Sequence, residues 1–220
     1  MYDRKKFKSI LYSGASLYGI RLEDRALSLF ETYYDLLSDW NERMNLVSKR
    51  DMNRFVEYHL LDSLKVSSCF DMLKVKNILD FGSGAGLPGI PLTIAFPHLK
   101  TTLVDSRKKR CLFLENIIKS IPLSELRIIC SRMETLPDSL NGLFDMVITR
   151  GTVKLVEFFH ASKRFINKNG FLVSIKGNNI EDEIEELKNV PDSYFFDILI
   201  TEPKNVSNVR QGKIIIISGK

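Results

Sequence analysis

The chain has 220 residues, of which 44% are hydrophobic, and its formal net charge is +5. This length suits one α/β domain of about 150 residues with a smaller element attached. No apolar run is long enough to cross a membrane, and the charged N-terminus leads into no signal-like apolar core. We therefore expect a cytoplasmic protein with no membrane partner.

The cysteines and histidines give no sign of a metal site. Cys69, Cys111 and Cys130 are isolated and odd in number, they form no C-x-x-C pair, and the histidines are scattered. We expect no bound metal, and we expect all three cysteines to be reduced, buried packing residues.

Residues 1–70 have a helical pattern, so we expect an N-terminal helical extension packed on a core formed by residues 71–220. Asp24 can cap a helix that has one apolar face. The pattern breaks over residues 41–49, after which Asp51 can cap a second long helix that runs to about Phe70.

From Val75 onward, strand-like and helix-like segments alternate, which predicts a mostly parallel, seven-stranded sheet with helices on both faces. The last two strands are joined by a loop, residues 202–212, and can pair as an antiparallel hairpin at the sheet edge. The expected strands are 75–81, 101–105, 126–130, 144–149, 170–176, 194–201 and 213–218, and the expected helices are 88–96, 107–120, 153–167 and 180–188.

The segment from Asp80 to Pro91 reads Asp-Phe-Gly-Ser-Gly-Ala-Gly-Leu-Pro-Gly-Ile-Pro and lies between an expected strand and helix. Gly82, Gly84 and Gly86 permit positive φ and lack Cβ atoms, so the backbone can approach a ligand closely. A plain packing turn is the alternative, but the alternating glycines and the preceding acid disfavour it.

Two cofactors use such a cradle. The same loop matches G-x-G-x-x-G, a weak dinucleotide signal. A dinucleotide would place its pyrophosphate at the helix N-terminus, where the carboxylate of Asp80 would repel it. S-adenosylmethionine carries an ammonium and a sulfonium instead, so the acid favours a methyltransferase.

Asp105 ends the second expected strand, about 20 residues after the glycine turn, where a doubly wound fold places an acid that binds ribose hydroxyls. The alternative is a solvated strand end or a helix cap. The basic run Arg107, Lys108, Lys109 and Arg110 follows at once. It is either a solvated helix start or a contact with a polyanion such as RNA.

Several motifs together resemble one family. They are Asn41-x-x-x-Asn45-Leu46, His59-x-x-Asp62-Ser63, the loop from Gly82 to Pro91, Val104-Asp105-Ser106 with Lys109-Arg110-x-x-Phe113-Leu114, Arg132-x-Glu134, and Phe144-Asp145-x-Val147-x-x-Arg150. This combination resembles the bacterial methyltransferases of small-subunit (16S) ribosomal RNA that act on guanine N7, the glucose-inhibited division protein B family.

The resemblance implies a Rossmann-like class I methyltransferase fold, S-adenosylmethionine as cofactor, and 16S ribosomal RNA or the small ribosomal subunit as partner of a monomer. It places cofactor contacts at Gly82, Leu87, Met133, Glu134 and Arg150. The chain has Thr149-Arg150-Gly151 where the family usually has Ser-Arg-Ala.

Guanine N7 carries a lone pair and no proton, so its methylation needs placement of the reactants and no general base. Asn45 and Arg150 are candidates for positioning the substrate, and Arg150 can alternatively pair with Asp145. His59 and Asp62 lie three residues apart and are expected to form a structural pair. The alternatives are a methyltransferase of the same fold with a small-molecule or protein substrate, and a dinucleotide-binding or non-enzymatic domain.

Overall fold

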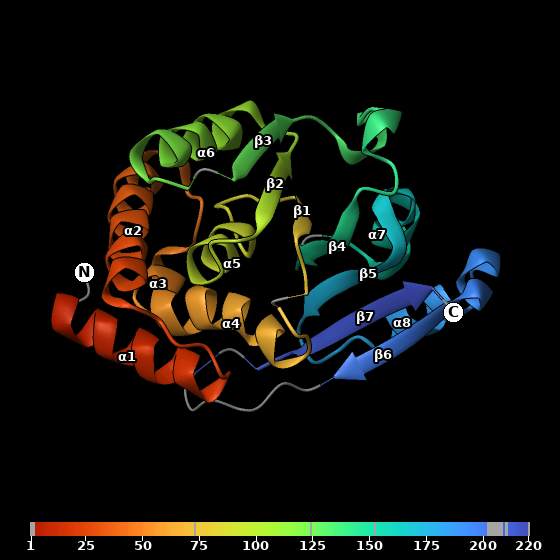
Figure 1. The fold of residues 1–220 in the computed structure, drawn as a ribbon, viewed down its shortest axis with the longest axis horizontal. Helices are drawn as coiled ribbons and strands as arrows, with labels where there is room; N and C mark the ends of the chain where they lie inside the picture. Colours follow the sequence, from red (N-terminus) through yellow and green to blue (C-terminus); the bar gives the residue numbers. More distant parts are fainter. Residues whose placement is uncertain are drawn as a thin grey trace.

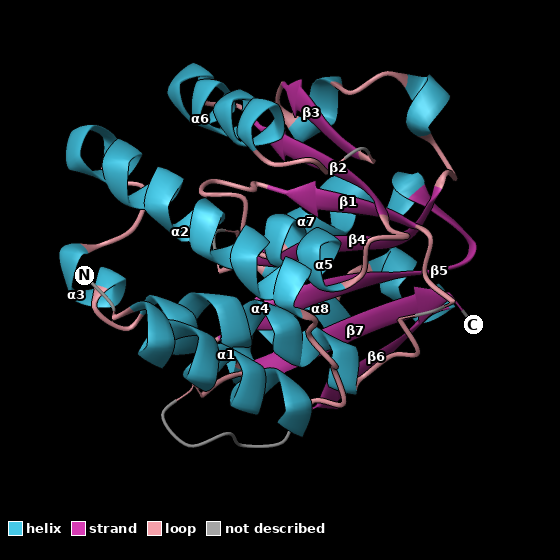
Figure 2. Ribbon diagram, turned by 60° about the vertical axis from the view of Figure 1, so that its left-hand side comes forward, coloured by secondary structure: helices cyan, strands magenta, loops and turns pink. Residues whose placement is uncertain are grey.

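The computed structural model describes residues 3–72, 74–123, 125–151, 153–201, 209 and 211–219. Its centre is a seven-stranded sheet with the strand order β3-β2-β1-β4-β5-β7-β6. The strands are β1 (Asn77–Phe81), β2 (Lys100–Asp105), β3 (Leu126–Cys130), β4 (Phe144–Arg150), β5 (Ile166–Lys176), β6 (Phe196–Thr201) and β7 (Lys213–Gly219). The expected sheet and all seven expected strands are therefore confirmed (Figures 1 and 2).

Pairing is parallel from β3 through β5, and β7 is antiparallel to both β5 and β6. The expected antiparallel pairing of the last two strands is thus confirmed, but β7 inserts between β5 and β6, so that only β6 lies at the edge. Most of the expected connecting loop, residues 202–208 and 210, lies outside the described residues. The strand order reverses between β1 and β4, and such a switch point opens a crevice at the carboxyl ends of the strands.

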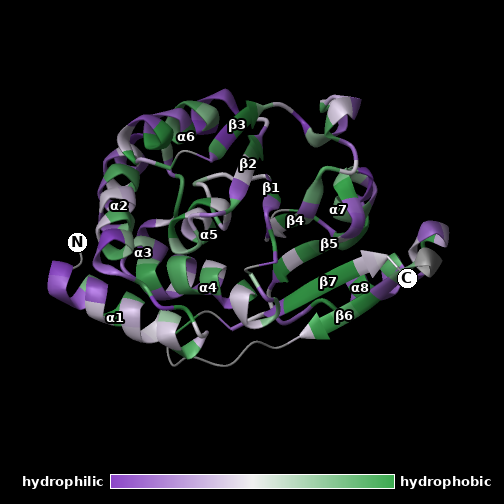
Figure 3. Ribbon diagram, viewed as in Figure 1, coloured by the Kyte–Doolittle hydropathy of each residue, from purple (hydrophilic) through white to green (hydrophobic). Residues whose placement is uncertain are grey.

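Helices cover both faces of the sheet, as expected. One apolar core joins the sheet to the N-terminal helices, α5 and α6, and a second joins its other face to α7 and α8. Figure 3 shows hydrophobic residues running along β5, β7 and β6. The helices are α1 (Arg4–Leu17), α2 (Asp24–Met44), α3 (Lys49–Met52), α4 (Leu61–Leu64), α5 (Gly89–Ala95), α6 (Lys108–Ser120), α7 (Leu155–Ser162) and α8 (Glu181–Lys188).

The N-terminal extension differs from the expectation in its details. Glu23 is the N-cap of α2, without a side-chain bond, and Ser48 caps α3 by accepting the N–H of Asp51. Asp24 and Asp51 therefore lie inside their helices rather than at the caps. The expected second helix is divided into α3, a π-helical turn (Val56–Leu60), α4 and a 3₁₀ turn (Lys65–Ser68). No glycine or proline marks these breaks.

The expectation of three reduced cysteines is wrong. Cys111 on α6 and Cys130 at the end of β3 are joined as a disulfide, and Cys69 is free. The bridge forms because α6 packs against β3, which brings two residues that are 19 apart in sequence to a Cα–Cα distance of 5.8 Å. In the sequence the two cysteines are isolated and form no C-x-x-C pair, so nothing there indicated this contact.

Within the described residues, no helix is long and apolar enough to cross a membrane. The same residues contain no group of three or more His, Cys, Asp or Glu side chains arranged to hold a metal ion.

Candidate functional site

The glycine loop after β1 has the backbone that a ligand cradle needs. Gly82, Gly84 and Gly86 have φ values of +71°, +58° and +86°. The N–H groups of Gly82 and Ser83 donate to the carbonyl of Val104 at 2.9 and 3.1 Å, which fixes the loop on the end of β2. Positive φ strains any residue with a Cβ, so the alternating glycines are required by this conformation.

Tyr33 on α2 holds the loop from the other side. Its hydroxyl donates to the carbonyl of Ala85 at 2.6 Å, and its side chain is fully buried. Burial raises the pKa of the Tyr33 phenol well above its usual range, so it stays a donor. The sequence showed Tyr33 only as part of an apolar helix face, although a buried tyrosine hydroxyl commonly needs a partner.

Asp80 lies beneath the loop and is completely buried. Its Oδ2 accepts the N–H of Gly89, the first residue of α5, at 3.0 Å, whereas Oδ1 has no hydrogen-bond partner among the described residues. Burial raises the pKa of Asp80 to about 7, and the nearby negative charge of Asp105 adds to the rise. An acceptor without a partner beside a glycine cradle fits a ligand that carries a hydrogen-bond donor or a positive charge.

Asp105, at the end of β2, is 3% exposed and faces the same loop. Its Oδ2 accepts the N–H of Gly84 at 2.9 Å, and its Oδ1 accepts the N–H of Arg107 at 2.8 Å. The Arg110 guanidinium binds the same carboxylate, with Nη1 3.2 Å from Oδ2. The structure thus brings together the expected ribose acid, the glycine loop and one residue of the basic run.

The basic run begins helix α6. Arg107, Lys108 and Lys109 are exposed, whereas Arg110 is partly buried over Asp105. The first turn contains no acidic residue, and Arg107 provides no side-chain cap. Cations at this position oppose the helix dipole, and the Asp105 carboxylate, which accepts the Arg107 N–H and binds Arg110, is an anion at the start of this helix.

Arg150 ends β4 and is tied to the N-terminal helices. Its Nε lies 2.8 Å from Oδ2 of Asp62, and its Nη2 contacts the Tyr58 carbonyl at 3.0 Å and Nδ1 of His59 at 2.8 Å. Lys65 binds the other oxygen of Asp62 at 2.6 Å. His59 of the π-helical turn and Asp62 of α4 thus both bind Arg150 at the end of β4, so their structural role is to join these N-terminal elements to the sheet.

Asp145 does not provide the alternative partner that the sequence offered for Arg150. Its Oδ2 accepts the backbone N–H groups of Lys76 and Asn77, each at 2.8 Å, at the amino end of β1. Arg150 is at the opposite, carboxyl end of β4, so the length of the strand separates the two side chains. Lys176 also ends a strand, but its Nζ binds Glu183 of α8 at 2.8 Å.

The remaining expected site residues follow the strand ends or α2. Leu87 is a buried member of the loop, and Met133 is buried in a 3₁₀ turn (Met133–Thr135) after β3. Glu134 is exposed and lines a hollow of about 470 Å³. Asn45 ends α2 with φ +48° and lines a polar hollow of about 490 Å³ that Asn41 and Lys49 also line.

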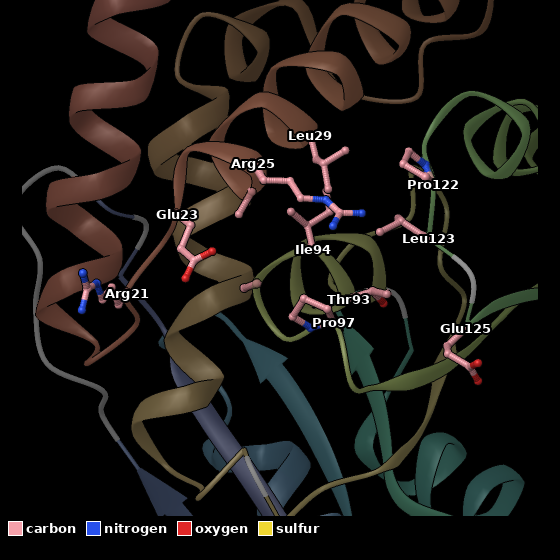
Figure 4. A pocket seen from close by; sticks show the side chains of 12 residues that line it. Arg21, Glu23, Arg25, Leu29, Thr93, Ile94, Pro97, Pro122, Leu123 and Glu125 are labelled. Atoms are coloured by element: carbon pink, nitrogen blue, oxygen red, sulfur yellow. The ribbon is translucent and has the colours of Figure 1, made fainter.

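Another hollow, of about 380 Å³, lies at the far end of α5 (Figure 4). Its walls come from Arg25 and Leu29 of α2, from Thr93 and Pro97 around the end of α5, and from Leu123 before β3. The glycine loop enters α5 at its start, and this hollow is at its end. It is therefore separate from the cradle.

The family model for rRNA small subunit methyltransferase G matches residues 26–205. The chain belongs to this family. It is 37% identical over 184 residues to ribosomal RNA small subunit methyltransferase G of Thermoanaerobacter sp. (strain X514), covering 83% of this chain and 77% of that one. Its identity to the protein of the same name from Bacillus subtilis (strain 168) is 35% over 174 residues, covering 78% and 73%.

Solved structures show the same fold. A putative S-adenosyl-L-methionine-dependent methyltransferase from Methanococcus maripaludis matches with a TM-score of 0.57 and 18% identity, covering 73% of this chain and 85% of that one. A putative caffeoyl-CoA O-methyltransferase from Staphylococcus aureus matches with a TM-score of 0.56 and 16% identity, covering 84% and 99%. The expected Rossmann-like class I methyltransferase fold is confirmed.

Proposed function

We propose that this protein transfers a methyl group from S-adenosylmethionine to N7 of a guanine in 16S ribosomal RNA, as free RNA or in the small ribosomal subunit. Membership of the rRNA small subunit methyltransferase G family supports both the reaction and the substrate class. The observation that carries the proposal is the hydrogen bond from the N–H of Gly84, in the middle of the glycine loop, to the carboxylate of Asp105. We further propose that the enzyme acts as a cytoplasmic monomer without a metal.

The residues of the cradle fit this cofactor. Asp105 would bind the ribose hydroxyls, and Oδ1 of Asp80 is a buried acceptor near which a cationic amino group is favourable. Gly82 and Gly84 are partly exposed and leave the backbone accessible, whereas Gly86 is buried and its missing Cβ makes room for Ile90. Leu87 and Met133 would supply apolar contacts. Glu134 is the candidate for the adenine edge.

When bound, the cofactor supplies an electrophilic methyl group, and guanine N7 supplies the lone pair. The chain therefore needs to hold the two reactants in line and to exclude water, and it needs no side chain that removes a proton. Arg150 suits a positioning role, because its side chain is 10% exposed and its guanidinium is held by Asp62 and His59. We propose that Arg150 and Asn45 place the cofactor and the unstacked base at the carboxyl end of β4.

The proposal predicts both a cofactor preference and a substrate preference. Calorimetry of the purified protein should detect binding of S-adenosylmethionine and none of NAD. Incubation with labelled S-adenosylmethionine should transfer label to small ribosomal subunits that lack the modification, or to 16S ribosomal RNA taken from them. Label on 23S ribosomal RNA, on ribosomal proteins or on no RNA would instead indicate a methyltransferase with another substrate. Binding of NAD alone would indicate a dinucleotide domain.

A further inference from the structure

The Arg110 guanidinium covers the carboxylate that is proposed to bind ribose. Its Nη1 lies 3.2 Å from Oδ2 of Asp105. A Cβ built on Gly84 would lie 3.7 Å from the same Nη1 and 3.9 Å from Cζ, so the guanidinium also extends over the glycine loop. Two independent contacts thus place Arg110 inside the cradle rather than on the outer surface of α6.

The carboxylate of Asp105 has too few acceptor positions for all these donors and a ribose. An ionised carboxylate offers about four lone-pair sites. The N–H groups of Gly84 and Arg107 use two of them, at 2.9 and 2.8 Å. Two vicinal hydroxyls need the remaining two, and Arg110 already uses one. Ribose and Arg110 therefore compete for Asp105.

Arg110 is the partner that can leave. The Gly84 and Arg107 donors are backbone groups fixed by the loop and by the start of α6. The Arg110 side chain is 28% exposed and flexible, whereas Asp105 is 3% exposed. Arg107, Lys108 and Lys109 are exposed on the same first turn, which contains no acidic residue. A displaced guanidinium would therefore join three other exposed cations.

We propose that Arg110 couples cofactor binding to RNA binding: the cofactor ribose displaces its guanidinium from Asp105, and the freed guanidinium binds an RNA phosphate. This inference rests on the proposed function. Guanidinium and phosphate form bidentate, charge-assisted hydrogen bonds, so the released side chain has a favourable partner. Each ligand must break the contact between Arg110 and Asp105, but together they break it once. Binding of the two ligands is therefore cooperative, and each tightens the other by the same factor.

The test measures RNA binding with and without the cofactor. S-adenosylhomocysteine is the probe, since it retains the ribose and cannot transfer a methyl group, and the RNA is unmodified 16S ribosomal RNA. With the unaltered protein, the probe should tighten RNA binding about 5-fold, near the lower end of known couplings. The slope of log affinity against log salt should also steepen by about 0.7–0.9, equivalent to one additional phosphate contact.

Two variants distinguish coupling through Arg110 from the general contribution of positive charge to RNA affinity. Arg110→Gln should bind the probe at least as tightly as the unaltered protein, because no competitor remains, and its RNA affinity should not respond to the probe. Lys109→Gln should weaken RNA binding with and without the probe and keep the full coupling. If Arg110→Gln is unstable, Arg110→Met removes the same charge and keeps the apolar stem.

Four results would overturn the inference. Weaker probe binding by the folded Arg110→Gln protein would make Arg110 a cofactor contact. Coupling that persists in Arg110→Gln would assign it to other residues. If Lys109→Gln weakens RNA binding but the probe does not change the RNA affinity of the unaltered protein, the coupling is disproved. The basic run would then still be part of the RNA-binding surface. If neither substitution changes RNA affinity or its salt slope, the basic run is not part of the RNA surface, and Arg110 does not couple the two ligands. The methylation assay described above tests the reaction independently of this result.

Discussion

Nε of Arg150 lies 2.8 Å from Oδ2 of Asp62, and this ion pair joins the carboxyl end of β4 to helix α4. Both side chains are almost fully buried, at 10% and 2% exposure. Lys65 binds the other oxygen of the same carboxylate at 2.6 Å. One buried carboxylate therefore neutralises two cations where the N-terminal extension meets the sheet.

Asp62→Asn should lower the free energy of unfolding by about 3–5 kcal/mol, because it leaves Arg150 and Lys65 without a buried counter-charge. Urea unfolding at neutral pH measures the change. The matched control is Asp35→Asn, which removes an exposed partner of Arg4 and should change stability little, since exposed pairs contribute little. Equal losses in the two variants would mean that the buried network is not structurally important.

Tyr33→Phe should lower the free energy of unfolding by about 1–3 kcal/mol, because the buried carbonyl of Ala85 loses its donor. It should also weaken S-adenosylmethionine binding, since that bond holds the glycine loop. Tyr12→Phe serves as the control, as Tyr12 is 49% exposed and its loss should affect neither quantity. Chemical unfolding and calorimetry measure the two effects. Unchanged cofactor affinity in Tyr33→Phe would show that the loop holds its shape without α2.

Gly84→Val should abolish S-adenosylmethionine binding, because a branched side chain strains a φ of +58° and projects over the cradle. Gly142→Val is the matched control: Gly142 has φ +68°, and no atom of the described residues lies within 4 Å of a Cβ built on it. Both variants carry comparable backbone strain, so both should lose stability. Only Gly84→Val should lose the cofactor, as measured by calorimetry on folded protein. Normal binding by that variant would rule out this loop as the cradle.

The raised pKa of Asp80 leads us to expect that the stability of the protein depends on pH. Its pKa is raised by burial from 3.8 to about 7, so the native state holds a proton that the unfolded state has already lost between these values. The native protein binds more protons in this window, and stability therefore falls as the pH rises from about 4 to 7. Unfolding free energies of the unaltered protein and of Asp80→Asn should diverge across that window and run parallel above it. A difference that does not vary with pH would show that Asp80 is ionised throughout.

The sequence was sufficient for the parts of the fold that depend on local patterns. Apolar strand runs followed by glycines or acids marked the ends of β1 and β2. The spacing predicted that the glycine turn and Asp105 follow two neighbouring strand ends, and parallel neighbouring strands end side by side. The hydrogen bond from the Gly84 N–H to Asp105 was not predicted. The family motifs added the reaction, which no single residue of this chain specifies.

Two of the contacts that sequence reasoning missed join elements far apart in the chain. The Tyr33 hydroxyl meets the Ala85 carbonyl across 52 positions, and Arg150 meets His59 across 91. Neither pair has a local signature, because packing of the extension on the sheet decides which polar groups meet. The disulfide of Cys111 with Cys130 was missed for another reason: it joins consecutive elements, 19 residues apart, and forms only because α6 lies on β3.

The most direct test of the account is nucleoside analysis of 16S ribosomal RNA after incubation with the protein and S-adenosylmethionine. Small subunits that lack the modification are treated, their RNA is digested to nucleosides, and the methylated products are separated and weighed by mass spectrometry. We predict 7-methylguanosine as the new product, and we predict that Gly84→Val forms none. A methyl group on another base, on ribose or on a ribosomal protein would contradict the proposed reaction.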